Sequence, residues 1–310
     1  MVPRKASFVL IKDERGLFVL LKDAKAKTKA KIKCKKGLSN KMSYSIGFIG
    51  GGNIAEAMIS GLKKTNKELE IRVTNLSNRG RLQGLVDRYD VTAASLQDLV
   101  ENSQVVIIAV KPKDVQGVLK DLTAFSLQNK LVISVAAGVP LRVFAKYLPG
   151  VAVIRAMPNT SMAVLHSMTG LVRGENVTNE QAEMGEKIFS ATGRIMWVPE
   201  KNINALTAIS GSGPAYFYLF AESLIKAGVE SGLSEEEAEI LVLETLIGSG
   251  KMIAESDKSP GKLREEVTSP NGTTFAALNV FMDENLAQTV LKAVKACARR
   301  AEDLEGEYSE

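Results

Sequence analysis

The sequence of 310 residues predicts an α/β fold in which a doubly wound, mostly parallel sheet is followed by an all-helical part. Three observations predict it. A short apolar run at residues 45–49 ends in three glycines and leads directly into a helix-forming stretch. Strand and helix patterns then alternate as far as residue 134. After about residue 200 the strand patterns cease and helical patterns continue towards the C-terminus.

The first part is expected to alternate strands and helices along the chain. Strands are predicted at 45–49, 71–75, 105–110 and 131–134, with a short piece near Val91, and helices at 54–62, 81–89, 96–102 and 115–122. Residues 105–110 are apolar without interruption, which is typical of a strand that is buried on both faces of a parallel sheet.

The second part is expected to contain helices at 202–208, 214–231, 235–255, 262–267, 274–283 and 285–305. Ser234 and Glu237 have the spacing of a capping box at the start of helix 235–255, and Gly232 ends the helix before it. Ser259 and Pro260 resemble a cap and a first-turn proline. Helix 235–255 is apolar over much of its surface, so it needs cover on several sides, and we expect a partner subunit to supply this cover in an obligate dimer.

The glycine cluster is the main candidate binding feature. Gly50, Gly52 and Ala55 have the spacing G-x-G-x-x-A between a strand and a helix, with a second strand where a βαβ unit requires one. Such a turn brings backbone N–H groups at a helix start close to a pyrophosphate, so Asn53 and Ile54 join the candidate contacts. The pattern therefore predicts a dinucleotide site in a Rossmann-type domain, the alternative being an ordinary strand–helix turn.

The end of the second strand bears on which dinucleotide binds. NAD-binding domains usually place an acidic residue there to hold the ribose 2′-OH, whereas this chain has Asn75, Ser77 and Arg79. Because no carboxylate would repel a 2′-phosphate, NADPH is predicted, with NADH as the alternative. The other interpretation is a solvated turn in which Arg79 and Arg81 face water.

Two further strands end in residues that suit a nicotinamide ring. The strand at 105–110 ends in Ala109-Val110 and is followed by Lys111-Pro112, and the strand at 131–134 is followed by a small-residue turn that includes Ala137. Small side chains there would let the ring lie close to the backbone. For Lys111-Pro112 the alternative is a simple strand stop.

The composition divides the chain into a basic leader and an acidic remainder. Residues 1–41 contain 11 Lys and 2 Arg against 3 acidic residues, so the other 269 residues carry a formal charge of −5 although the whole chain carries +5. We expect three segments: a leader, 1–41, that is disordered or not native, with Met42 as a natural start; a dinucleotide-binding domain, 42–200; and an all-helical dimerisation and substrate domain, 201–310. The alternatives for the leader are a targeting peptide, which its acidic residues and scarce Arg and Ser disfavour, and an arm for nucleic acid or anionic membrane.

The rest of the composition narrows the class of protein. The two cysteines, Cys34 and Cys297, suggest no disulfide framework and fit a reducing, cytoplasmic compartment, and Cys297 has the helical spacing of a core residue. No apolar run approaches the length of a membrane span, and residues 42–310 show no nucleic-acid footprint. No metal cluster or Ser/His/Asp group is visible either.

Six motifs, in order, resemble those of the pyrroline-5-carboxylate reductase family, from residue 42 to the C-terminus. They are G-F-I-G-G-G-N-I-A at 47–55, A-V-K-P at 109–112, S-V-A-A-G at 134–138, M-P-N-T at 157–160, and S-G-S-G-P-A-Y at 210–216 together with V-T-S-P-N-G-T-T at 267–274. The resemblance implies NAD(P)H-dependent reduction of 1-pyrroline-5-carboxylate to L-proline, the last step of proline biosynthesis. It also implies a homodimer, in many members assembled into a decamer of five dimers, with each active site between the cofactor of one subunit and the helical domain of its partner.

The resemblance also implies roles for individual residues. The loop with Val267, Ser269, Gly272 and Thr273 would hold the substrate carboxylate, and Thr274 would contact the ring nitrogen as the catalytic candidate. A Ser-Pro-Asn-Gly-Thr-Thr turn before a helix suits an anion, although the same turn would also serve as a helix cap. The further contacts that the resemblance implies are Asp257 near the substrate and Asn159 at the cofactor.

Some positions depart from the family pattern. Asp257 stands where many members have Glu, and Leu96 where some have an Asn near the cofactor. Ser161, Leu165, His166 and Ser167 replace a Pro and acidic or Gly residues. His166 is the only histidine, but it lies in a variable-looking turn and is not expected to be catalytic.

Hydride transfer to a protonated cyclic imine needs alignment and a held carboxylate more than an acid–base dyad. One alternative is another NADP-linked imine or β-hydroxyacid reductase, yet the latter enzymes use a Lys that the segment S-G-S-G-P-A-Y-F-Y-L lacks. The other alternative is a non-catalytic NADP-binding regulatory relative, in which the substrate loop would be broken.

Overall fold

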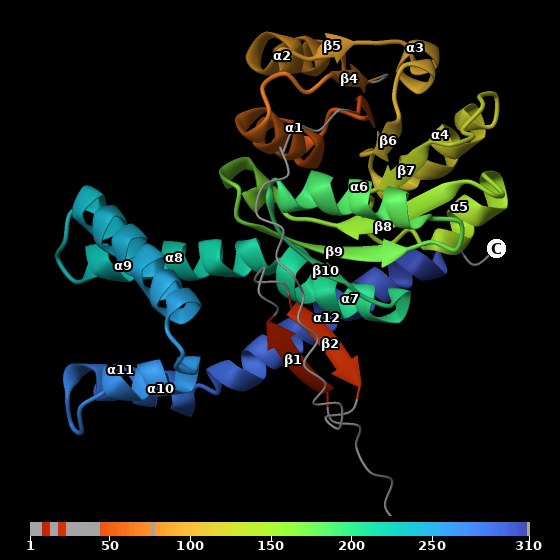
Figure 1. Ribbon diagram of the computed structural model, residues 1–310. Coiled ribbons are helices and arrows are strands. Elements are labelled where there is room, and N and C mark those ends of the chain that lie inside the picture. Colours follow the sequence, from red (N-terminus) through yellow and green to blue (C-terminus); the bar gives the residue numbers. More distant parts are fainter. Residues whose placement is uncertain (1–7, 13–17, 23–43, 76–77, 309–310) are drawn as a thin grey trace, which may run out of the picture. The chain divides into compact units, whose positions relative to one another are not determined.

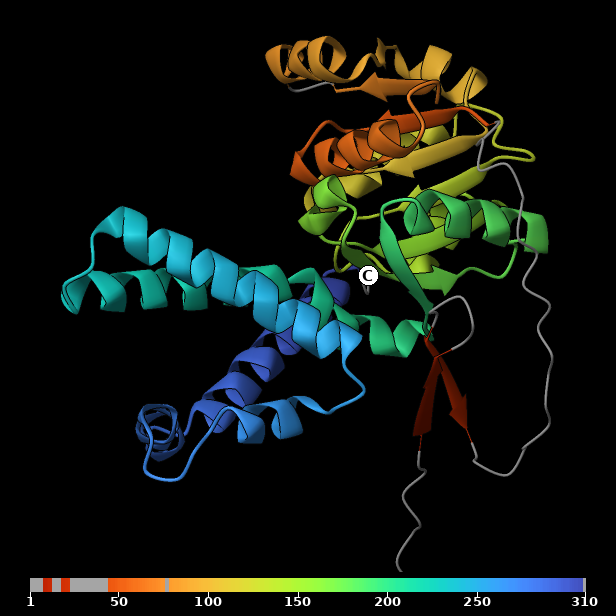
Figure 2. The same ribbon diagram turned by 60° about the vertical axis from the view of Figure 1, so that its left-hand side comes forward.

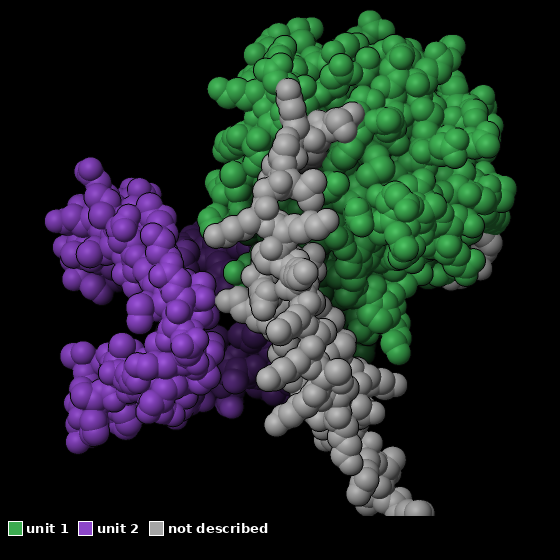
Figure 3. All heavy atoms as spheres, viewed as in Figure 1, with its two compact units in different colours: residues 1–211, 298–310 green, residues 212–297 purple. Residues whose placement is uncertain are grey.

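The computed structural model describes residues 8–12, 18–22, 44–75 and 78–308. The chain divides into two compact units, coloured in Figure 3. The first contains residues up to Gly211 and again from Ala298 onwards, and the second contains Ser212–Cys297. The division at residue 211 lies beyond the expected boundary at 200, and the last helix returns the chain to the first unit. The functional division into a cofactor domain and a dimerisation domain remains a prediction.

The first unit is built on one sheet of eight strands in the order β10-β9-β8-β7-β6-β3-β4-β5. Within it, β5-β4-β3-β6-β7-β8 reproduces the strand order 3-2-1-4-5-6 of dinucleotide-binding domains, so the strand order reverses between β3 and β6. All these neighbours are parallel, whereas β8 and β9 are antiparallel. The strands are β3 (Ile46–Ile49), β4 (Ile71–Thr74), β5 (Thr92–Ala93), β6 (Val105–Ile108), β7 (Leu131–Ser134), β8 (Ala152–Met157), β9 (Ser167–Arg173) and β10 (Gly193–Trp197).

Helices cover both faces of this sheet, as a doubly wound fold requires (Figures 1 and 2). One core contains buried side chains of α1 (Asn53–Thr65), α2 (Arg79–Tyr89) and α6 (Asn179–Ser190), and the other those of α3 (Leu96–Glu101), α4 (Val115–Leu122) and α5 (Leu141–Tyr147). Strand β6, Val-Val-Ile-Ile, is buried along its whole length because it lies between these two cores. The fold class expected from the sequence is confirmed.

The sequence-based expectation left out every element between residues 135 and 200. Three strands, β8 to β10, and helices α5 and α6 lie there. Strand β8 carries Arg155, and β9 reads Ser-Met-Thr-Gly-Leu-Val-Arg, so neither shows a clear apolar pattern. Their side chains are nevertheless mostly buried, because the strands extend a sheet that the earlier elements have begun.

The second unit consists of helices. They are α8 (Gly213–Glu230), α9 (Glu235–Glu255), α10 (Pro260–Glu266), α11 (Thr273–Asp283) and most of α12 (Leu286–Gly306). The capping box of Ser234 and Glu237 is present, Gly232 has a φ of +102°, and Ser259 caps α10 with Pro260 in its first turn, as expected. A π-helical turn, Thr207–Gly211, and the short helix α7 (Ile203–Leu206) replace the single helix expected at 202–208.

Two strands lie in the leader, β1 (Phe8–Lys12) and β2 (Phe18–Lys22), and pair antiparallel. The expectation of a disordered leader did not include this hairpin, whose runs Phe-Val-Leu-Ile and Phe-Val-Leu-Leu have strong strand propensity. The Lys-rich stretch at 23–41, with Cys34, and Met42 fall outside the described residues. The expectation for that stretch therefore stays a prediction.

Candidate active site

The turns named as cofactor contacts follow β3, β4, β6, β7 and β8, which are all parallel. Parallel strands end at the same edge of a sheet, so these turns lie along one edge, with the reversal of strand order between β3 and β6 in their midst. This is where open α/β sheets bind their ligands. The topology thus brings the candidate cofactor residues of the first unit together.

The glycine turn connects β3 to α1 and is held on both sides. The Gly50 N–H donates to Thr74 O at 2.8 Å, and the Ala109 N–H donates to Ile49 O at 2.8 Å. Gly50 has a φ of +105°, and a Cβ there would lie 2.6 Å from Ala109 O. Only glycine fits this position, because the turns after β3 and β6 touch through their backbones.

The other end of this turn is open. Gly52 is the N-cap of α1 without a side-chain cap, and a Cβ placed on it would meet no atom nearer than 4.0 Å. The first internal helical bond is Glu56 N to Gly52 O, so the N–H groups of Asn53, Ile54 and Ala55 precede it at the helix start. Uncapped N–H groups beside an exposed glycine are what a pyrophosphate requires, so the residues present fit a dinucleotide.

Arg81 contacts the glycine turn, which the sequence analysis did not predict. Its Nε donates to Gly51 O at 2.5 Å, and its Nη2 donates to Asn53 Oδ1 at 2.6 Å and to Glu56 Oε2 at 3.2 Å. The guanidinium therefore joins the start of α2 to the glycine turn, instead of facing only water. The missed signal was Asn78, whose side chain caps α2, so the helix begins at Arg79, two residues before the expected start, and Arg81 is its third residue. Side chains in a first turn point back towards the helix N-terminus.

The residues expected near the ribose lie between β4 and α2. Asn75 follows β4, and its Nδ2 would lie 3.2 Å from a Cβ on Gly51, so it borders the glycine turn. Arg79 is the first residue of α2 and is exposed. Ser77 lies outside the described residues. At the end of β4, where NAD-binding domains usually have a carboxylate, the described residues are Asn75 and Arg79.

The loops after β6 and β7 lie next to each other because these strands pair from Val105 with Leu131 to Ile108 with Ser134. Ala109 is buried and Val110 half-buried, whereas Lys111 is exposed and begins a short 3-10 turn, Pro112–Asp114. After β7, Ala137 is half-buried and Gly138 has a φ of +72°. Small residues do follow both strands, as the nicotinamide hypothesis requires.

Asn159 is buried, and its amide is used within the protein. Its Oδ1 accepts from Ser161 N at 3.1 Å, which caps a 3-10 turn, and its Nδ2 donates to Ser210 O at 3.0 Å. In this arrangement the side chain fixes the end of β8 and the π-helical turn, so its cofactor role stays a prediction. Leu96, at the position where some family members have an Asn near the cofactor, packs against the core that contains α3, α4 and α5.

The second unit holds the candidate substrate loop, between α10 and α11. Asn271 has a φ of +57°, the Gly272 N–H donates to Ser269 O at 3.0 Å, and a Cβ on Gly272 would collide with Ser269 Oγ. Helix α11 starts at Thr273 with Gly272 as N-cap and no side-chain cap. The N–H groups of Thr273, Thr274 and the next residue lie at this uncapped helix start, and the Ser269 hydroxyl borders Gly272, an arrangement that suits a carboxylate.

The remaining substrate candidates lie around this turn. Thr273 and Thr274 are exposed, and Val267 is 68% exposed just after α10. Asp257 is exposed in the α9–α10 connection. Thr268, which was not a candidate, donates its hydroxyl to Arg264 O at 2.6 Å and holds the end of α10.

Other polar groups lie away from the two candidate regions or act structurally. His166 is exposed in the turn before β9, and its N–H donates to Ser161 O. Cys297 is half-buried, with its thiol 3.3 Å from Ser212 Oγ, and burial, followed by contacts with Cys297, raises the pKa of Tyr216 nearby. Among the described residues, no group of three or more His, Cys, Asp and Glu side chains is placed to hold a metal ion.

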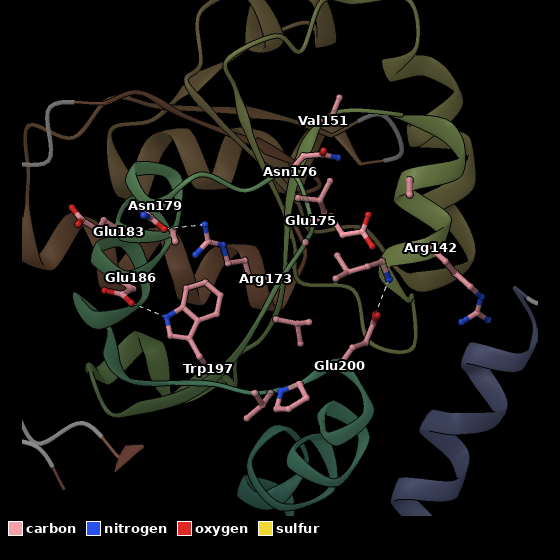
Figure 4. A pocket seen from close by; sticks show the side chains of 18 residues that line it. Arg142, Val151, Arg173, Glu175, Asn176, Asn179, Glu183, Glu186, Trp197 and Glu200 are labelled. Carbon is pink, nitrogen blue, oxygen red and sulfur yellow. Dashed lines mark hydrogen bonds between the residues drawn. The ribbon is translucent and has the colours of Figure 1, made fainter. Parts of the chain in front are cut away.

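A large open cavity of about 1190 Å³ lies elsewhere in the first unit (Figure 4). It is lined from α5, α6 and the segments at the start of β8 and the ends of β9 and β10, with Trp197 donating to Glu186 Oε1 at 2.7 Å. Because β9 and β10 run opposite to the other strands, their ends lie at the edge of the sheet remote from the glycine turn. None of the candidate site residues lines this cavity.

Comparison with known proteins shows which protein families the two parts of the chain resemble. A family model described as pyrroline-5-carboxylate reductase dimerisation matches residues 200–304, and one described as NADP oxidoreductase, coenzyme F420-dependent, matches residues 45–138. Fold and matches together define an NADP-linked oxidoreductase with a helical dimerisation domain, hence a homo-oligomer. No helix within the described ranges has the length and apolar character needed to cross a bilayer.

Relatives along nearly the whole length identify the family. A pyrroline-5-carboxylate reductase of Mycobacterium leprae is 38% identical over 282 residues, which cover 84% of this chain and 96% of that one, and Bacillus subtilis pyrroline-5-carboxylate reductase 2 is 35% identical over 85% and 96%. The structure of the Coxiella burnetii enzyme is 37% identical, with a TM-score of 0.76 and coverage of 85% and 99%. That of Plasmodium falciparum pyrroline carboxylate reductase with NADP bound is 29% identical, with a TM-score of 0.78 and coverage of 85% and 98%. The chain belongs to the pyrroline-5-carboxylate reductase family, which confirms the resemblance.

Proposed function

We propose that this protein reduces 1-pyrroline-5-carboxylate to L-proline with NADPH, the last step of proline biosynthesis. The observation that carries the proposal is the intact pair of anion-binding helix starts, at Gly52 and at Gly272, in a chain that matches its relatives along 96% of their length. A non-catalytic relative would be expected to have lost the second of them. The absence of a Lys from the first turns of α8 disfavours a β-hydroxyacid dehydrogenase.

Hydride transfer balances with few protein groups. NADPH, when bound, would supply a hydride to the imine carbon, C2 of the protonated pyrroline, which becomes C5 of proline, while the C=N π electrons pass to nitrogen and give the neutral ring amine. The N–H groups at the start of α11, with the hydroxyls of Ser269 and Thr273, hold the substrate carboxylate. Thr274 hydrogen-bonds the ring nitrogen. The rate then comes chiefly from holding the two rings in register.

The cofactor preference follows from the end of β4. Asn75 and Arg79 leave that region without a carboxylate, so a 2′-phosphate meets no like charge, and we propose NADPH over NADH. The glycine turn with Asn53, Ile54 and Ala55 would take the pyrophosphate. Ala109, Val110, Lys111, Pro112 and Ala137 would border the nicotinamide half.

We propose a homodimer, assembled further into a decamer of five dimers, in which the substrate loop of one subunit serves the cofactor of its partner. In the second unit large apolar side chains of α8 and α9 are exposed on a single chain, among them Phe217 (61%), Ile240 (56%) and Leu243 (55%). Surfaces of this kind mark subunit contacts. A cytoplasmic location is proposed from the cysteine content, two in 310 residues.

The test is a spectrophotometric assay of nicotinamide oxidation with the purified protein. Pyrroline-5-carboxylate should drive NADPH oxidation with equimolar proline formation, and linear 2-keto acids should not. Oxidation with keto acids but not with the cyclic imine would contradict the proposal. The same assay with NADH in place of NADPH tests the cofactor preference.

A further inference from the structure

Residues 304–308, which comprise the last turn of α12 and the two residues after it, touch the loop after β6, within the first unit. The Tyr308 hydroxyl donates to Pro112 O at 2.6 Å, and the Tyr308 ring packs against the core that contains α3, α4 and α5. Pro112 opens the 3-10 turn next to Lys111, at the reversal of strand order. A residue 196 positions further along the chain thus holds a loop on the candidate cofactor edge.

The same segment also touches the loop after β7. Gly138 has a φ of +72°, and a Cβ on it would lie 2.6 Å from Leu304 Cβ. The backbone of this turn therefore lies directly against Leu304. Both loops that would border the nicotinamide half have a neighbour in residues 304–308.

An ion-pair cluster anchors the segment between these two contacts. Arg155 of β8 is buried, and its Nη1 lies 2.7 Å from Glu305 Oε1 and 3.1 Å from Glu200 Oε1. The Arg142 guanidinium of α5 donates to the Glu305 backbone oxygen at 3.0 Å. Glu305 is partly exposed, but Arg155 is buried, so removing its carboxylate partner would leave a buried charge without compensation, and the pair holds Glu305 against β8.

We propose that residues 304–308 form a strap that positions the cofactor loops, and that Tyr308 is its positioning residue for the loop at Lys111 and Pro112. The inference rests on the proposed function, because it takes these loops to contact NADPH. A loop that is held before the ligand arrives needs less ordering on binding, so the strap increases affinity without touching the cofactor. Burial, followed by the charges of Glu307 and Asp114, raises the pKa of Tyr308, so its hydroxyl remains a donor in neutral and mildly alkaline buffers.

The test compares Tyr308→Phe with the parent and with Tyr147→Phe, in the full-length protein. Tyr147, at the end of α5, packs against the same core as Tyr308. The variant Tyr147→Phe therefore removes a hydroxyl next to that core but does not remove the bond to Pro112 O, so it is the matched control. NADPH affinity is measured by fluorescence titration without substrate, and KM and kcat by steady-state assay. Because a net hydrogen bond contributes on the order of 1 kcal/mol, the Kd and KM for NADPH should rise about threefold to tenfold in Tyr308→Phe only.

The same variant should keep its kcat at saturation and its KM for pyrroline-5-carboxylate, a split that general destabilisation would not give. Leu304→Ala, which shortens the contact with Gly138, should weaken NADPH binding in the same direction. If the parent binds NADPH and turns over while Tyr308→Phe matches it within twofold, the strap is wrong and the proposed function stands. If both KM values rise together in Tyr308→Phe, the strap is also wrong. A parent that binds no NADPH contradicts the proposed function, and the strap with it.

Discussion

At the scale of single residues, Arg79 and Arg81 are expected to contribute differently to dinucleotide binding, one by pairing with a 2′-phosphate and the other by shaping the glycine turn. Arg81 holds the glycine turn through Gly51 O and Asn53 Oδ1, whereas Arg79 is exposed at the first position of α2. A residue that shapes the turn affects every dinucleotide. A residue that pairs with the 2′-phosphate affects only the one that carries it.

We therefore expect Arg81→Ala to weaken NADPH and NADH alike, by about tenfold, because it removes charge-assisted hydrogen bonds to the turn. Arg79→Ala should weaken NADPH and leave NADH within about twofold. Titration of both variants with both cofactors measures this. An Arg81 variant that loses only NADPH affinity would assign the 2′-phosphate to Arg81 and contradict the turn-holding role.

Thr274 tests the substrate half-site. Thr274→Val keeps the shape of the side chain and removes the hydroxyl, so we expect kcat/KM for pyrroline-5-carboxylate to fall about tenfold or more, with NADPH affinity unchanged. Thr274→Ser, which keeps the hydroxyl, is the matched control and should retain most of the activity. Parent-like kinetics in the valine variant would remove Thr274 from the mechanism.

At the residue scale the sequence indicated turns at Gly50 and Gly272, where the backbone favours glycine, while the binding roles of these residues stay predictions. Gly50 has a positive φ against Ala109, and Gly272 is closed in by Ser269. The contact of Arg81 with the glycine turn was missed, because the position of that side chain depends on where α2 begins. The cofactor role of Asn159 stays a prediction, and the bonds that its buried amide makes within the protein depend on the fold around β8.

At the scale of elements, the turn between β3 and α1 must fit closely against Ala109 and must also leave space in front of the helix start. Two variants test these two requirements separately. Gly50→Ala should lower the stability by about 2 kcal/mol or more, because the methyl group meets Ala109 O in a left-handed conformation. Gly52→Ala should change the stability by about 1 kcal/mol or less, since its Cβ has room in the protein, yet it should abolish tight NADPH binding by filling the space in front of the helix start.

Thermal unfolding and NADPH titration of these two variants measure the two effects. The account requires the larger loss of Tm in Gly50→Ala and a loss of affinity without a large loss of Tm in Gly52→Ala. A Gly52→Ala protein that binds NADPH as the parent does would show that the pyrophosphate lies elsewhere.

Element prediction worked where the apolar period was strong. The strands up to residue 134 and the helices after 210 agree with the structure to within a few residues, as at α9 and α11. Between them, Arg155 in β8 and Gly170 in β9 interrupt the pattern. Arg155 is tolerated in a buried strand because Glu200 and Glu305 meet it, and those partners lie 45 or more positions further along the chain.

At the scale of the whole molecule, the exposed apolar surface of α9 favours burial against a partner subunit. Leu243→Glu places a charge on a surface that the dimer would bury, so we expect monomers by light scattering. NADPH binding should persist, because the cofactor residues belong to one subunit, while reduction of pyrroline-5-carboxylate should fall at least a hundredfold.

Lys187→Glu, an exposed change of charge on α6 in the first unit, is the control and should leave assembly and turnover unchanged. Leu243→Glu monomers with full activity would contradict the proposal that a partner subunit completes the site. The sequence predicted the dimer because α9 has no continuous polar face. It did not predict the strap, because contacts of Tyr308 and Leu304 with loops far back in the chain leave no local pattern.

Isotope transfer tests the central claim most directly. The protein is incubated with pyrroline-5-carboxylate and NADPH carrying deuterium at the transferable position of C4, and the product is analysed by mass spectrometry and NMR. The account predicts L-proline with one deuterium, located at C5. Unlabelled proline, or deuterium at any other carbon, would contradict direct hydride transfer between the two rings.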